Sequence, residues 1–140
     1  MTRKYKTVKG GETEIRAYVK RSNELWRHAL FAYEEHDYDA YAVMAIHASI
    51  SLADAACIVQ QGSRYAGISH DEAVQYFYDL GIKDEAFKKA CRRLGQIISE
   101  KSIAEYGGNN LNAKTAQSIH LNSERFRDYL FETLLKKYLS

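Results

Sequence analysis

The chain has 140 residues, of which 46% are hydrophobic and 27% charged, and its formal net charge at pH 7 is +2. This length is close to that of a single domain, and the composition is too hydrophobic for a disordered protein. Residues 1–21 hold seven Lys or Arg against two acids, whereas residues 22–80 hold two against nine. We therefore expect residues 1–11 to form a flexible basic tail and residues 12–140 to form one domain.

The first predicted helix covers about residues 13–36, where apolar side chains recur at steps of three and four. A second helix starts at Asp37 or Asp39, because either side chain can accept the free N–H groups of a helix start. It runs to about Gln61, and Gly62 suits the left-handed backbone that ends many helices. This second helix is apolar on nearly every side, so we expect it at the centre of the protein.

A short helix is predicted between the second and third long helices. Ser69 and Glu72 form a capping box that begins it, and Gly81 ends it. Asp84 then opens the third long helix, whose apolar side chains lie along one stripe. Gly107 and the glycine after it are expected to end that helix.

The fourth long helix begins at Asn110 or Asn112 and continues to the C-terminus. Four long helices, three of them with a single apolar stripe, predict an all-α fold: an antiparallel up-and-down four-helix bundle with a short extra helix between helices 2 and 3. No segment alternates polar and apolar residues at period two, so we expect no strands.

Cysteine use and the N-terminus indicate a cytoplasmic protein. Cys57 and Cys91 lie at apolar helical positions, which favours small buried side chains over a disulfide. The basic N-terminus lacks the apolar stretch of a signal peptide. Residues 42–59, "AVMAIHASISLADAACIV", are the only candidate for a membrane span, but Asp54 inside it would cost about 2.5–3.5 kcal/mol. We therefore expect no membrane association.

Three polar side chains interrupt the apolar second helix. His47, Ser51 and Asp54 are spaced by four and then three residues, so they share one narrow strip of its surface. A buried carboxylate requires a cation or several donors, which Asp54 is expected to find nearby. The strip is either a structural network, in which Asp54 anchors the next loop through Arg64, or part of a ligand site.

A second set of polar residues lies where the stripe of the third helix ends, at Lys101. If helices 2 and 3 are antiparallel neighbours, His47 lies level with residues 98–101. One end of the bundle would then gather His47, Lys101, Glu105 and Tyr106. The chain has no Gly-rich phosphate loop, no Cys-x-x-Cys and no His-Glu-x-x-His. We expect no metal and no cofactor.

Four segments resemble the compact prokaryotic members of the HEPN superfamily over about residues 12–139. They read "AIHASISLADA", "GSRYAGISHDEAV", "LGQIISEKSIAEYGG" and "SERFRDYLFETL". The resemblance implies a short up-and-down helical bundle that dimerises. It also implies that His47, Asp54, Arg64 and His70 belong to one polar cluster, which we predict to bind a ligand.

Many members of this superfamily are metal-independent ribonucleases, some of them toxins paired with a nucleotidyltransferase-like antitoxin. Their motif is an arginine and a histidine separated by four to six residues, usually with a polar residue after the arginine. The matching positions here are Lys101, Ser102 and Tyr106. Lysine lacks the planar fork that holds phosphate at two points, and tyrosine exchanges protons poorly near pH 7.

These replacements favour a non-catalytic module that binds a nucleotide or RNA, or that assembles with other proteins. Lys101 would supply charge and Tyr106 a stacking face, with Ser102 beside them as a ligand contact. The alternative is an endoribonuclease of the toxin–antitoxin type, in which Lys101 and Tyr106 act in a dimer. In either case we expect a homodimer and an RNA or nucleotide ligand, and the resemblance implies the antitoxin partner.

Overall fold

The structure is a computed structural model that describes residues 4–139, except for the side chain of Glu105. The described residues are mostly helical, with one small two-stranded sheet. In chain order the elements are β1 (Thr7–Lys9), α1 (Glu12–Glu34), α2 (Tyr38–Gln61), β2 (Ser63–Tyr65), α3 (His70–Tyr78), α4 (Glu85–Ser99), α5 (Lys101–Tyr106), α6 (Ala113–Glu132) and the 3₁₀ turn η1 (Lys136–Tyr138).

The predicted ends of the helices are confirmed where a capping side chain marks them. Ser69, Asp84 and Asn112 each accept the backbone N–H three residues further on, at 3.2, 2.6 and 2.8 Å. Each satisfies a donor that the first turn of a helix leaves unpaired. Gly62 ends α2 with φ = +78°, a left-handed conformation that glycine adopts without strain.

The helix expected from Asp84 to Gly107 is divided. α4 ends at Ser99 and α5 begins at Lys101, because the N–H of Glu100 bonds to the carbonyl of Ile97 at 3.2 Å. This is the tighter hydrogen-bonding pattern of a 3₁₀ turn, and it separates the two helices. The last helix also stops early, at Glu132, and η1 follows it instead of a continued α-helix.

The expectation that the chain has no strands is wrong. β1 and β2 form an antiparallel pair in which Val8 lies opposite Arg64. The pairing extends at one end, where the N–H of Gly10 bonds to the carbonyl of Gly62 at 3.1 Å. β1 therefore lies within the segment expected to be a flexible tail. Its backbone groups are satisfied by a partner more than fifty residues away, which no local pattern reveals.

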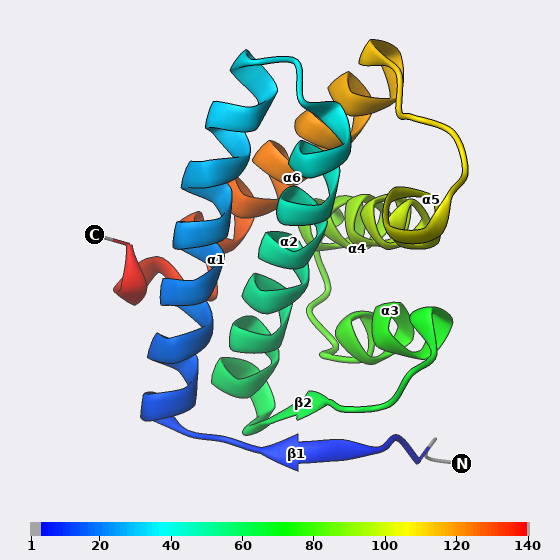
Figure 1. Ribbon diagram of the computed structural model, residues 1–140. Coiled ribbons are helices and arrows are strands. Elements are labelled where there is room, and N and C mark those ends of the chain that lie inside the picture. The colour runs from blue at the N-terminus through cyan, green and yellow to red at the C-terminus, as the bar shows by residue number, and fades with distance from the viewer. Residues whose placement is uncertain (1–3, 140) are drawn as a thin grey trace.

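α1 and α2 lie side by side and antiparallel, and α6 packs behind them, whereas α3 and α4 run across that direction on the other side of α2 (Figure 1). α2 is therefore the central helix, as expected. It is the one helix in the described residues long and apolar enough to cross a membrane, and 67% of its most apolar window is buried. Its apolar character is thus explained by its place in the core.

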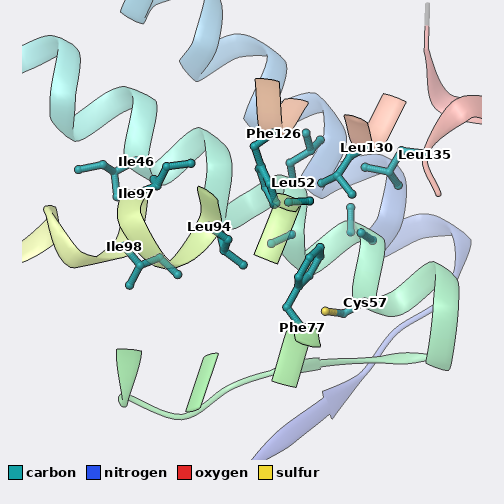
Figure 2. Close-up of a cluster of buried hydrophobic side chains, with 14 of the residues drawn as sticks. Ile46, Leu52, Cys57, Phe77, Leu94, Ile97, Ile98, Phe126, Leu130 and Leu135 are labelled. Atoms are coloured by element: carbon teal, nitrogen blue, oxygen red, sulfur yellow. The ribbon is translucent and has the colours of Figure 1, made fainter. Parts of the chain in front are cut away.

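The core forms where α2 meets α3, α4 and α6. Leu52 and Cys57 of α2 contact the same cluster as Phe77 of α3, Leu94 of α4 and Phe126 of α6 (Figure 2). Both cysteines are free and buried, which confirms their predicted role as small core side chains. Close approach of the helices depends on the fully buried alanines of α2, which are Ala42, Ala45, Ala48, Ala55 and Ala56.

Candidate functional site

Two hollows meet at Ile50 and Asp54, near the middle of α2. The α1–α2 hollow has a volume of about 370 Å³ and is lined by residues of those two helices, including Tyr18 and Arg21. The loop hollow has a volume of about 380 Å³ and is lined by β2, the following loop and the α4–α5 junction, including Arg64. We call the two hollows together the Asp54 site.

Two arginines are held at this site by one tyrosine ring. The guanidinium carbons of Arg21 and Arg64 lie 5.3 and 5.5 Å from the centre of the Tyr18 ring. Both distances fit cation–π contacts. Neither guanidinium forms an ion pair with a carboxylate in the described part of the chain. The site therefore presents two guanidinium groups whose charge no neighbouring carboxylate neutralises at close range.

The Asp54 carboxyl lies in the wall shared by the two hollows. Its burial raises its pKa from 3.8 to about 7, and the nearby charges of Arg64 and Arg21 limit the increase. Burial has this effect because it removes water from the charged form. Near pH 7 the carboxyl is therefore present in both its neutral and its ionised forms. Such a group can accept or donate a proton under ordinary conditions.

Hydrogen bonds between elements fix the groups around Asp54. The hydroxyl of Ser51 donates to the carbonyl of Tyr18 at 2.9 Å, which fixes α1 against α2 beside the stacked arginines. Ser51 therefore makes a structural hydrogen bond between the two helices. Arg64 also donates to the carbonyl of Tyr65 at 3.3 Å.

The loop after β2 is shaped by the Tyr65 side chain. Its hydroxyl accepts the N–H of Ser69 at 3.0 Å and donates to Glu72 at 3.0 Å. Its ring occupies the space where a side chain on Gly67 would lie, so only glycine fits there. The loop is therefore held in one shape, although Ile68 at its tip is fully exposed.

Five of the predicted site residues line the Asp54 site. His47 and Asp54 line the α1–α2 hollow, and Arg64, His70 and Lys101 join Asp54 in the loop hollow. Lys101 shares the loop hollow with both Ile50 and Asp54, so it lies beside the part of α2 that is one to two turns beyond His47. These five residues therefore lie around two adjoining hollows.

Ser102 and Tyr106 line neither hollow. Both lie on α5, where Ser102 is exposed and Tyr106 is 80% exposed. The predicted gathering of His47, Lys101, Glu105 and Tyr106 is therefore found only in part, and the side chain of Glu105 is outside the described residues.

Sequence reasoning missed Arg21 and Tyr18. Arg21 was counted only among the basic charges of the N-terminal segment, and Tyr18 only as part of an apolar stripe. Their role depends on how α1 packs against α2, and the spacing within α1 carries no signal of it. No three His, Cys, Asp or Glu side chains in the described residues are grouped so that they could hold a metal ion.

Comparison with known proteins adds no relative to this description: no family model and no curated protein matches the chain. The resemblance to the HEPN superfamily stays a prediction from the four segments quoted above.

Proposed function

We propose that this protein binds a phosphate-bearing ligand, a nucleotide or RNA, at the Asp54 site without cleaving it. The observation that carries the proposal is the pair of guanidinium groups stacked on Tyr18. Arg21 and Arg64 come from different elements, face the same site and have no carboxylate partner among the described residues. Guanidinium groups bind phosphate through two parallel hydrogen bonds, so an anion would complete this arrangement.

Further side chains that can donate hydrogen bonds to an anion support the same ligand. Lys101 and His70 line the loop hollow beside Arg64, and His47 lines the other hollow beside Arg21. Among the described side chains that line the two hollows, Asp54 is the one carboxyl group, and it is neutral in part of the molecules near pH 7. A concave surface with this balance of charge attracts anions.

The placement of Tyr106 favours binding over cleavage. A ribonuclease that used Lys101 and Tyr106 would need both side chains within hydrogen-bond reach of one substrate. Lys101 lines the loop hollow, whereas Tyr106 is largely exposed and lines neither hollow. We therefore retain the non-catalytic function.

The wider proposal follows from the resemblance. In it, α1, α2, α4 and α6 correspond to the four helices of an up-and-down bundle, and α3 is the extra helix. The protein would act in the cytoplasm as a homodimer, with a nucleotidyltransferase-like protein as a partner. The contacts of α6 with both α2 and α4 support this correspondence.

Binding of AMP and of a labelled single-stranded RNA tests the proposal. We expect Arg64→Ala and Arg21→Ala each to weaken binding by about tenfold or more, because each removes a charge-assisted contact worth roughly 1.5–3 kcal/mol. Arg125→Ala is the matched control, since Arg125 is exposed on α6 and lines neither hollow. Failure of both ligands to bind would refute the proposal. Cleavage of the RNA that disappears in Lys101→Ala would show that the protein is an enzyme instead.

A further inference from the structure

The Asp54 site places one carboxyl near cations from two elements packed against α2. Arg21 approaches from α1 and Arg64 from β2, and both act on the charge of Asp54. Burial raises the pKa of the Cys57 thiol on the next turn of α2, and the nearby charge of Asp54 raises it further. Within the described part of the chain, the other titratable groups that line the two hollows are Tyr18, His47, Tyr65, His70 and Lys101.

An ionised Asp54 would act against an anion bound between the two arginines. The carboxyl lies in the wall that both hollows share, so an anion held by Arg21 and Arg64 would lie beside it. Two negative charges in a partly buried site repel each other strongly. A neutral Asp54 has the opposite effect, because its O–H can donate a hydrogen bond to the anion.

The number of donors distinguishes between kinds of phosphate. Two guanidinium forks supply four N–H groups, and a neutral Asp54 adds an O–H, which makes about five donors. A terminal phosphate has three free oxygens and carries close to two negative charges at pH 7. A phosphodiester has only two free oxygens and one charge. A terminal phosphate therefore matches the number of donors and the positive charge of the two arginines better than a phosphodiester does.

We infer that the Asp54 site binds the terminal phosphate of its ligand, a phosphomonoester, and that Asp54 takes up one proton from solvent as this phosphate binds. The inference rests on the proposed function and specifies the ligand class of the same site. The proton goes to a carboxylate oxygen of Asp54, and the resulting O–H donates to a phosphate oxygen. No covalent bond to the ligand forms or breaks.

The direction of the pH effect follows from linkage. Bringing a negative charge beside Asp54 raises its pKa above the value of about 7 in the free protein. Binding is therefore strongest below that value and weakens as the pH rises through it. An increase of about one unit on binding corresponds to a loss of affinity of about fivefold between pH 7 and pH 9. AMP remains almost fully dianionic over this range, so its own ionisation contributes little.

Calorimetric titration with AMP and with 3′,5′-cyclic AMP at pH 7, 8 and 9 tests the inference. The two probes share base and ribose, but only AMP has a terminal phosphate. We expect AMP to bind about tenfold more tightly at pH 7 and to lose about fivefold in affinity by pH 9. The Asp54→Asn variant retains a donor but no titrating group, so we expect it to bind AMP equally well from pH 7 to pH 9. Any pH dependence from the histidines would persist in this variant.

Asp37→Asn is the matched control, since Asp37 lies at the N-terminal end of α2, away from both hollows, and its side chain makes no capping bond. It should keep the pH dependence of the unmodified protein. Equal affinity for the two nucleotides, or the same pH dependence in Asp54→Asn, would overturn the inference and leave the proposed function intact. Absence of binding by either nucleotide and by RNA at every pH would overturn both.

Discussion

Replacing Asp54 by asparagine is expected to stabilise the protein at neutral pH. The folded state raises the pKa of this carboxyl, so it disfavours the ionised form that the unfolded chain adopts freely. The stability that the neutral acid contributes is complete below the unfolded value of 3.8 and is lost as the pH rises through about 7. Asparagine resembles the neutral acid in shape and does not ionise.

The size of the effect follows from the difference between the two pKa values. About three units separate 3.8 from about 7, and each unit corresponds to about 1.36 kcal/mol. Above pH 7 the ionised Asp54 therefore costs on the order of 4 kcal/mol, a large part of the stability of a small domain. Below pH 4 it costs almost nothing, because both states hold the proton.

Urea denaturation of Asp54→Asn and of the unmodified protein between pH 4 and pH 8 measures this difference. We expect the two free energies of unfolding to be nearly equal at pH 4 and to separate by about 3–4 kcal/mol at pH 7. Asp37→Asn should follow the unmodified protein throughout. A variant that is 3–5 kcal/mol less stable at pH 7 would refute the reasoning, because it would mean that Asp54 is ionised and paired in the folded protein.

Three further substitutions test other features of the structure. Ser123→Ala should leave stability unchanged or raise it by up to about 1 kcal/mol, because the buried Ser123 hydroxyl has no hydrogen-bond partner in the described residues. A loss of more than about 1 kcal/mol in thermal unfolding would contradict this expectation. Gly67→Ala should lower the free energy of unfolding by about 1–3 kcal/mol and weaken AMP binding, since the new methyl displaces the Tyr65 ring. Gly108→Ala is the control: it has open space around it and should change neither stability nor binding. Arg127→Lys should lower the free energy of unfolding in urea by about 2–3 kcal/mol. The buried Arg127 donates through both arms of its guanidinium to α1, each at 2.6 Å, and lysine has no such fork. Unchanged stability would show that one donor is sufficient.

The sequence predicts most helix ends because short-range signals mark them. Ser69, Asp84 and Asn112 cap helices within their own first turn, and Gly62 ends one by its own conformation. The break at Glu100 carries no such signal, since neither glycine nor proline lies there. β1 was missed for a related reason: three residues are too few to show alternation, and their partner strand is distant in sequence.

The site was predicted only in part because a site is a property of packing. His47 and Asp54 share a helix, so their spacing alone places them together. Arg64, His70 and Lys101 come from other elements, and the resemblance or the apolar stripe pointed to them. Nothing in the spacing of α1 distinguishes Arg21 from the basic residues that precede it, because its role is set by the contact of its guanidinium with the Tyr18 ring.

The pairing of Val8 with Arg64 has a practical consequence for anyone handling the protein. Thr7–Lys9 form one side of the ladder, and the other side carries Arg64, whose guanidinium we propose to bind phosphate. A change at the N-terminus is therefore expected to affect ligand binding through β2. An endopeptidase that cuts after Lys9, or a bulky fusion partner placed just before Thr7, would loosen β2 and change the measured affinity. Affinities obtained with differently trimmed N-termini are therefore not interchangeable.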